Sequence, residues 1–286
     1  MGRPRTQHIN PASSFGEDGT STIGSAFRIL SLFNHSASQW TVRDIARQLD
    51  MPYSTTHRYV RALERTGYIT RDASTSTYRV GLKVIELAGV ALNQVDARVQ
   101  GMRDLDHLAD VTGLNANMAV LHEGDAFHVA FSLRSAMPRM YSALGRRAVA
   151  HCTALGKVLL ADLPFEAVRQ IIEVYGWRPY TEKSIQDFAD LECALATVRA
   201  SGYALDRDER TVGTSCVAAP VRNHQGRVVS AICVTGPSDQ MSDDRLPTLI
   251  KQVKEHATTI SYQLGYDAET AELPPPLPRR GSRKPD

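Results

Sequence analysis

The side chains best suited to chemistry lie in one basic stretch near the N-terminus. Between positions 54 and 65, arginines recur at intervals of three or four residues, with hydroxyl groups and an imidazole before them. On a helix this spacing places the polar groups on one side. Guanidinium groups can read guanine edges in the major groove of DNA, and hydroxyl groups can bind phosphate. We predict DNA contacts from six side chains, with a solvated basic face as the alternative: Ser54, Thr55, His57, Arg58, Arg61 and Arg65.

Two further helices are predicted to position this stretch. Apolar residues at helical spacing, among them Ile23 and Phe27, predict a first amphipathic helix over residues 23–34. A capping-box pattern at Thr41–Asp44 predicts the start of the second helix. Pro52 ends it, because proline biases the preceding residue away from helical backbone.

The third helix is predicted to begin with a cap at Ser54 or Thr55 and to run to about residue 66. An alternating pattern interrupted by a small polar turn follows it and predicts a β-hairpin. Arg71 and Arg79 on this hairpin could reach the phosphates beside an occupied major groove. Three helices and a hairpin indicate a winged helix-turn-helix over residues 21–82.

Positive charge is concentrated in the same segment. The chain of 286 residues carries a formal net charge of +2, yet residues 21–82 hold eight arginines against four acidic residues, a net +4. Residues 101–266 carry a net charge of −2. A basic module joined to a mildly acidic one favours a nucleic-acid contact confined to the first module.

Several segments resemble the IclR-type bacterial transcriptional regulators, in the family's order and over about residues 21–265. They are TVRDIARQLDMPYSTTHRYVRALERTGYI, YRVGLKVIELA, HCTALGKVLLA, GYALDRDER and CVAAPV. The resemblance implies an α+β protein with a winged helix-turn-helix, a linker helix and a GAF/PAS-like effector domain with an antiparallel sheet. It also implies a sequence-specific regulator whose binding to double-stranded operator DNA is controlled by a small-molecule effector.

A linker is predicted over residues 83–100. Residues 82–93 would form a helix that is apolar on nearly every side, which one domain alone cannot cover. We expect this helix to pack against a second copy of the chain, with burial inside the monomer as the alternative. A homodimer, or a dimer of such dimers, would present two recognition helices to successive major grooves of a near-palindromic operator.

The remaining segments predict an effector domain over residues 101–266. Strands with helices between and after them indicate an α+β domain. The termini, residues 1–20 and 267–286, are rich in Ser, Gly and Pro and are expected to be disordered. The predicted strands are 115–122, 127–133, 216–222 and 227–234, and the predicted helices, after one that ends at Gly113, are 154–161, 165–175, 185–200 and 243–264.

The resemblance also implies where the effector binds. In IclR-type proteins that bind small carboxylic acids, the pocket joins the start of the helix matching residues 154–161 to polar side chains on late strands. Backbone N–H groups at a helix N-terminus favour an anion. Cys233 departs from the family pattern, because it stands where a hydroxyl group is expected. We predict a small carboxylic acid, aliphatic or aromatic, bound by six residues: Ala154, Leu155, Asp206, Cys216, Cys233 and Thr235.

Catalytic and cofactor motifs are missing from the sequence. It contains no G-x-S-x-G, H-E-x-x-H, G-x-x-x-x-G-K-[ST] or G-x-G-x-x-G pattern. We therefore expect no enzymatic activity, no catalytic residue and no cofactor. Scattered histidines and cysteines leave a metal site open, although no metal ligand is predicted. No stretch approaches the roughly 20 apolar residues that span a membrane, so a cytoplasmic protein is expected.

The cysteines leave a second function open. Cys152, Cys193, Cys216 and Cys233 lie far apart in the sequence, and Cys152, Cys216 or Cys233 could make the chain a thiol-based redox-responsive regulator. Such a sensor must be exposed and must form a thiolate readily. Three of the four lie in apolar strand or helix contexts, which favours the ligand-responsive regulator.

Overall fold

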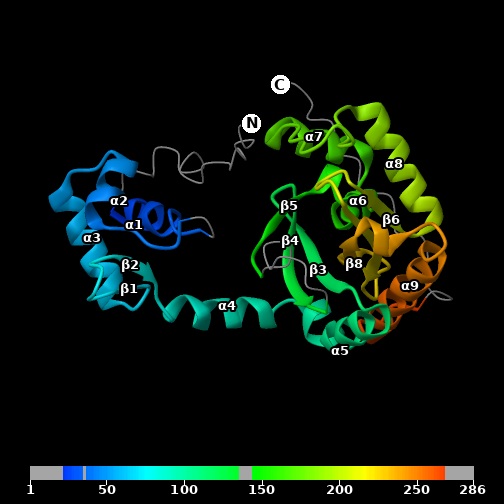
Figure 1. Cartoon of the computed structure of the whole chain (residues 1–286), viewed down its shortest axis with the longest axis horizontal. Coiled ribbons are helices and arrows are strands. Elements are labelled where there is room, and N and C mark those ends of the chain that lie inside the picture. Colours follow the sequence, from blue (N-terminus) through cyan, green and yellow to red (C-terminus); the bar gives the residue numbers. More distant parts are fainter. Residues whose placement is uncertain (1–21, 35–36, 135–143, 268–286) are drawn as a thin grey trace, which may run out of the picture. The chain divides into compact units, whose positions relative to one another are not determined.

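The computed structural model describes residues 22–34, 37–134 and 144–267 (Figure 1). The chain divides into two compact units, Met1–Ala91 and Leu92–Asp286, each with its own hydrophobic core. The arm predicted at residues 1–20 lies outside the described residues, as does the tail predicted at residues 267–286 apart from its first residue.

The first unit is a helix-turn-helix followed by a hairpin. Side chains from both parts, among them Ile29, Ile45, Val60 and Tyr78, share one core. This arrangement confirms the predicted winged helix-turn-helix fold. The described elements are α1 (Thr22–Leu30), α2 (Val42–Leu49), α3 (Tyr53–Arg65) and the antiparallel strands β1 (Ile69–Arg71) and β2 (Tyr78–Val80).

The ends of α2 set the turn that leads into α3. The backbone N–H of Asp44 donates to Thr41 Oγ1 at 3.1 Å, and the Thr41 hydroxyl donates to the Asp44 carboxylate at 2.7 Å. The predicted cap by Thr41 is confirmed, whereas the Asp44 carboxylate accepts from the side chains of Thr41 and Arg47 and not from a backbone N–H. Asp50 ends the helix in the left-handed region, with φ of 51°, and Pro52 then precedes α3.

Two local predictions in this unit are wrong. α1 ends at Leu30, and Ile23 and Phe27 are 71% and 53% exposed, so only Leu30 and Phe33 of the predicted apolar stripe pack against the core. α3 begins at Tyr53 without any side-chain cap, because Pro52 occupies the cap position with φ of −56°. Proline presets this angle, so the residues predicted as caps, Ser54 and Thr55, lie inside the first turn.

The predicted linker contains a break. α4 (Lys83–Asn93) ends two residues before α5 (Asp96–Thr112) begins. α5 ends at Gly113, as predicted, with φ of 65°. No residue of α4 is buried within the described chain, and the side chains of Leu82 and Ile85 are 77% and 65% exposed.

The second unit is built on an antiparallel sheet, which confirms the predicted α+β class. Within the described residues six strands lie in the order β5-β4-β3-β8-β7-β6. The edge strands β5 and β6 were not predicted, because three or four residues are too few to show an alternating pattern. The strands are β3 (Asn115–His122), β4 (Asp125–Ser132), β5 (Arg147–Val149), β6 (Ala204–Arg207), β7 (Thr214–Arg222) and β8 (Val228–Pro237).

Helices cover both faces of this sheet (Figure 1). On one face α5 and α9 (Leu246–Gln263) pack against β3, β4, β7 and β8. On the other face lies α6 (Ala154–Ala161), with α7 (Phe165–Tyr175) and α8 (Phe188–Ser201) in the same core. All eight residues of α6 are buried.

The strand register aligns residues that the sequence separates. Asp206 on β6 lies opposite Cys216 on β7, and Cys216 lies opposite Thr235 on β8. Asn117 on β3 lies opposite Cys233. Directly opposed residues in neighbouring strands share a face of the sheet, so Asp206, Cys216 and Thr235 form one row.

Candidate functional site

The two sides of α3 differ sharply in exposure. Thr56, Tyr59, Val60 and Leu63 are buried against the rest of the first unit. The exposed residues form a polar surface along the helix, to which five of the six residues predicted to contact DNA belong. Ser54, His57, Arg58, Arg61 and Arg65 are exposed, and Thr55 is half-buried.

The side chains on this surface make few and weak contacts. Arg61 Nη1 lies 2.9 Å from Glu64 Oε2, in an exposed pair one turn apart. The guanidinium carbon of Arg58 lies 5.2 Å from the centroid of the Tyr59 ring. An exposed ion pair such as that of Arg61 contributes little to stability, so Arg61 can exchange this contact for DNA groups at small cost.

The hairpin carries two more cations. Arg71 on β1 and Arg79 on β2 are exposed, and Arg71 Nη2 donates to Ser76 Oγ at 3.3 Å. The sequence predicts that both arginines can reach DNA phosphates. They extend the basic surface of the first unit beyond α3.

The second unit holds a cavity of about 50 Å³ on the α6 face of the sheet. All six residues predicted to bind the effector line it, although they come from four different elements. The structure therefore brings together Ala154, Leu155, Asp206, Cys216, Cys233 and Thr235.

The N-terminus of α6 supplies hydrogen-bond donors to this cavity. Thr153 Oγ1 accepts from the backbone N–H of Gly156 at 3.2 Å, which leaves the first N–H groups, those of Ala154 and Leu155, without a helical acceptor. Gly156 is required here, since an added Cβ would lie 2.2 Å from the Cα of Ala150. The helix start is thus fixed against the turn before it.

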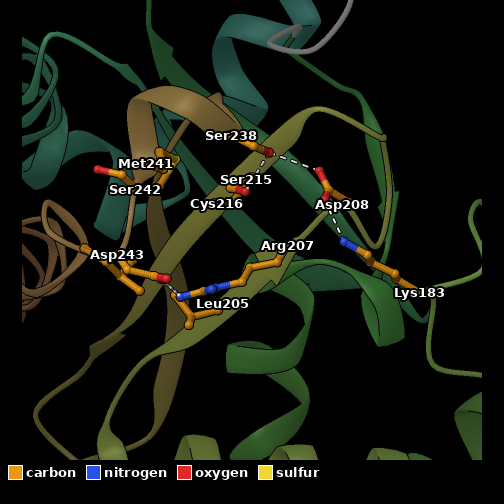
Figure 2. A pocket seen from close by; sticks show the side chains of 11 residues that line it. Lys183, Leu205, Arg207, Asp208, Ser215, Cys216, Ser238, Met241, Ser242 and Asp243 are labelled. Carbon is orange, nitrogen blue, oxygen red and sulfur yellow. Dashed lines mark hydrogen bonds and ion pairs between the residues drawn. The ribbon is translucent and has the colours of Figure 1, made fainter.

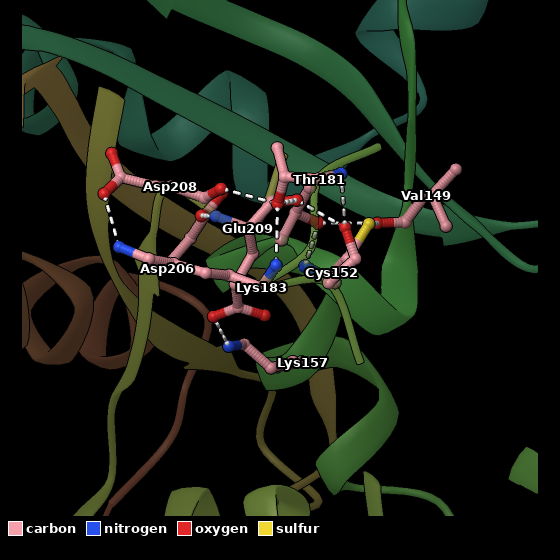
Figure 3. Close-up of polar contacts among 11 residues, drawn as sticks. Val149, Cys152, Lys157, Thr181, Lys183, Asp206, Asp208 and Glu209 are labelled. Carbon is pink, nitrogen blue, oxygen red and sulfur yellow. Dashed lines mark hydrogen bonds and ion pairs between the residues drawn. The ribbon is translucent and has the colours of Figure 1, made fainter. Parts of the chain in front are cut away.

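Asp206 is the buried carboxyl group of the cavity, with 3% of its surface exposed. Its Oδ1 accepts from the backbone N–H of Glu209 at 2.9 Å. Burial first, and the charge of Glu209 second, raise the pKa of Asp206 to about 7, against the opposing effect of Lys157. Near Asp206, Lys157 Nζ and Glu209 Oε1 form a nearly buried ion pair at 2.5 Å (Figure 3).

Sequence reasoning missed six polar residues that line the same cavity: Asn117, His128, Thr153, Arg210, Thr211 and Thr214. Asn117 Oδ1 is buried without a hydrogen-bond partner. Burial, with the charges of Arg210 and Arg146, lowers the pKa of His128 to about 3, so the imidazole is neutral. The polar Asn117 within an apolar strand, and Arg210 at the end of GYALDRDER, were the available signals.

The three cysteines considered as thiol sensors, Cys152, Cys216 and Cys233, do not favour thiolate chemistry. Burial raises the pKa of Cys152 and of Cys233 to about 12, and it raises the pKa of Cys216 well above its ordinary value. The Cys216 thiol donates to Thr235 Oγ1 at 2.9 Å. Because a thiol sensor needs a thiolate near neutral pH, these surroundings argue against the redox-responsive alternative.

Two other kinds of feature are absent from the described part of the chain. No group of three or more His, Cys, Asp or Glu side chains there could hold a metal ion. No helix among the described residues is long and apolar enough to cross a membrane.

Comparison with known proteins gives family matches in both units. The IclR helix-turn-helix domain model matches residues 23–73, and the model of the bacterial transcriptional regulator IclR C-terminal domain matches residues 90–262. HTH-type transcriptional regulator XynR of Escherichia coli is 30% identical over 247 residues, or 86% of this chain and 98% of that protein. HTH-type transcriptional repressor AllR of Klebsiella pneumoniae is 30% identical over 264 residues, or 92% and 95%.

Solved structures agree with these matches. The IclR protein of Thermotoga maritima superposes with a TM-score of 0.72 at 26% identity, covering 86% of this chain and 99% of that one. An IclR homologue of Microbacterium hydrocarbonoxydans, crystallised with 4-hydroxybenzoate, shares the fold with a TM-score of 0.76 at 21% identity, covering 85% and 99%. The chain therefore belongs to the IclR family of bacterial transcriptional regulators, with a helix-turn-helix domain followed by the family's C-terminal domain.

Proposed function

We propose that α3 reads operator DNA and that the cavity beneath α6 binds a small carboxylate effector that alters operator affinity. The proposal that α3 reads DNA rests on one observation: α3 has an exposed row of Arg58, Arg61 and Arg65, and its opposite side is buried. A helix of this kind fits the major groove, where arginine pairs with guanine. The two arginines of the hairpin support the proposal, because they can bind the phosphates that flank the major groove.

The effector part rests on donors and acceptors that converge in one cavity. The free N–H groups of Ala154 and Leu155, together with the partly buried guanidinium of Arg210, favour an anionic group. The unpartnered Asn117 Oδ1 favours a hydrogen-bond donor on the same ligand. These requirements describe a carboxylate that also carries a hydroxyl or another N–H or O–H group.

The volume of the cavity favours a small ligand. About 50 Å³ holds a few water molecules, each of which needs about 10–15 Å³. An aliphatic hydroxy acid fits this space best, and an aromatic acid would require the cavity to widen. The 4-hydroxybenzoate bound to the Microbacterium homologue has the same pair of groups, a carboxylate and a hydroxyl.

Paired ligands test the effector proposal. Glycolate and acetate differ by one hydroxyl group, as do 4-hydroxybenzoate and benzoate, so calorimetric titration of the full chain measures what that donor contributes. We expect the hydroxylated member of at least one pair to bind about tenfold or more tightly and to change the affinity for operator DNA. Equal affinities within both pairs would contradict the role of Asn117, and no binding of any acid would contradict the carboxylate effector.

We further propose that α4 packs against a second copy of the chain. Its apolar side chains Ile85, Leu87 and Val90 are 65%, 50% and 60% exposed, which is a large apolar surface for a helix in water. Two copies would place two α3 helices against one operator. Light scattering on the parent chain and on Ile85→Glu tests this, because a parent chain that is monomeric at micromolar concentration would contradict the proposal.

A further inference from the structure

A second cavity, of about 260 Å³, lies in the same unit (Figure 2). Successive residues of a strand point to opposite faces, so Leu205 and Arg207 line this cavity, whereas Asp206 between them lines the effector cavity. The packing agrees, because Leu205 contacts the core that includes α5 and α9, and Cys216 contacts the core that includes α6. The two cavities therefore lie on opposite faces of the sheet at its β6–β7 end, and Cys216 borders both of them.

Two ion pairs line the second cavity (Figure 2). Lys183 Nζ lies 2.8 Å from Asp208 Oδ2, and Arg207 Nη2 lies 2.8 Å from Asp243 Oδ1. The Ser238 hydroxyl donates to the other oxygen of Asp208 at 3.0 Å. The charges of these pairs cancel, so the lining offers many donors and acceptors without a net charge.

The outer pair is free to rearrange around a ligand. The side chains of Arg207 and Asp243 are 53% and 84% exposed, and exposed pairs contribute little to stability. Asp208 is a fixed acceptor, because hydrogen bonds from Lys183 and Ser238 hold its pKa below the usual value. A ligand can therefore hydrogen-bond to Arg207 and Asp243 without displacing a buried charged group.

The remaining lining defines the class of ligand. Serine hydroxyls can both donate and accept hydrogen bonds, and three of them line the cavity: Ser242, and Ser215 and Ser238, whose hydroxyl oxygens lie 2.9 Å apart in a hydrogen bond. Leu205, Met241 and Leu246 supply apolar contacts in the same cavity. We propose that this cavity binds a neutral polyhydroxylated molecule of about the size of a monosaccharide, whose rim of hydroxyl groups meets the polar side chains and whose ring meets the apolar ones.

The position of the cavity couples it to the effector site. Residues 206–210 carry Asp206 and Arg210 toward the effector cavity and Arg207 and Asp208 toward the second one. The hydroxyl of Thr181 donates to the carbonyl oxygen of Asp208 at 2.8 Å (Figure 3). This hydrogen bond holds the backbone of residues 206–210 in place. A ligand on one side should change affinity on the other, and by linkage the effect is reciprocal. Only this coupling rests on the proposed function.

Titration of the full chain with D-glucose and with myo-inositol, without any effector, tests the second site. We expect saturable binding of at least one polyol, weakened about fivefold or more by Arg207→Gln and by Asp243→Asn. Arg227→Gln is the matched control, because Arg227 is exposed and does not line the cavity.

Three results would overturn the proposal: saturable binding of neither polyol, equal affinity of the parent and both cavity variants, or binding of inorganic phosphate at this site in place of the polyols. Because these titrations contain no effector, their failure would leave the carboxylate proposal intact. Failure of the carboxylate titrations would likewise leave the polyol site standing.

Discussion

The proposed DNA-binding surface on α3 and the proposed effector cavity differ in the exposure of their polar groups and in the number of elements that supply them. On α3 the candidate DNA-binding side chains come from one helix, and most are exposed. In the effector cavity the candidate groups come from several elements, and Asp206, Cys233 and Thr235 are each less than 10% exposed. DNA offers its phosphates to an open surface, whereas a small anion must be met by donors that are already desolvated. Changes on α3 should therefore affect binding alone, and changes in the cavity should affect both binding and packing.

The largest effect is expected on stability, at Gly156, where the start of α6 packs most tightly beside the effector cavity. An alanine at position 156 would bring its Cβ to 2.2 Å from the backbone of Ala150, so Gly156→Ala should lower the free energy of unfolding of the second unit by about 3 kcal/mol or more. Gly89→Ala is the control, because nothing lies within 4 Å of its added Cβ. Gly89 lies in the first unit, so this variant should leave the unfolding of the second unit unchanged.

Urea unfolding measures this difference. Trp177 lies in the second unit, so its fluorescence in a Trp40→Phe background reports that unit alone. If the unfolding curves of the parent and of Gly156→Ala coincide, the start of α6 is not the rigid element described above.

The next effect tests whether the buried row binds the effector. Thr235→Val keeps the volume and removes the hydroxyl that accepts from Cys216, and the loss should weaken effector binding by roughly 1.5–3 kcal/mol. Operator affinity without effector should be unchanged. Calorimetry with the tightest acid from the paired titrations measures it, beside Thr197→Val, an exposed threonine of α8.

Two outcomes would change the interpretation of this row. Unchanged effector affinity in Thr235→Val and in Asp206→Ala would place the pocket elsewhere. Loss of operator binding without effector would show that these residues are structural.

On the exposed side of the comparison, Arg58→Ala and Arg61→Ala should each weaken specific operator binding by about 1–3 kcal/mol if they read bases. If they meet phosphates instead, each should reduce the salt slope by about one. Stability should change little, because Arg61 loses only an exposed pair with Glu64. Electrophoretic titrations at several salt concentrations, with Arg227→Ala as the control, decide between these outcomes, and parental behaviour in both variants would contradict the assignment of α3.

The same contrast explains what the sequence could predict. The exposed face of α3 follows from helical spacing, so its residues could be named before the structure was known. The six effector residues came from the family resemblance and not from periodicity, because the row of Asp206, Cys216 and Thr235 depends on strand register. Asn117 and Arg210 were missed for that reason, since no local pattern shows which strands become neighbours. The exposure of Ile23 was missed because three- to four-residue spacing does not say which face of a short helix is covered.

The smallest expected effect is a pH dependence specific to the buried site. The pKa of Asp206 is raised from 3.8 to about 7, so the folded state holds this proton between these values and the unfolded state does not. By linkage, this group makes stability fall as the pH rises through that window, with no further change above about 7. The same sign applies to effector binding, because ionised Asp206 repels a carboxylate in the cavity.

Effector affinity should therefore fall by up to about tenfold between pH 6 and pH 8, as expected for a single proton lost near pH 7. The other groups of the cavity do not titrate in that range, since the pKa of His128 is about 3 and that of Cys233 about 12. Asp206→Asn keeps a neutral side chain of similar size, so its affinity should be the same at both pH values. Calorimetric titrations of the parent and the variant at pH 6, 7 and 8 separate the cases. A flat profile in the parent would mean that Asp206 does not face the bound carboxylate, and an equal slope in Asp206→Asn would assign the proton to the ligand or to another residue.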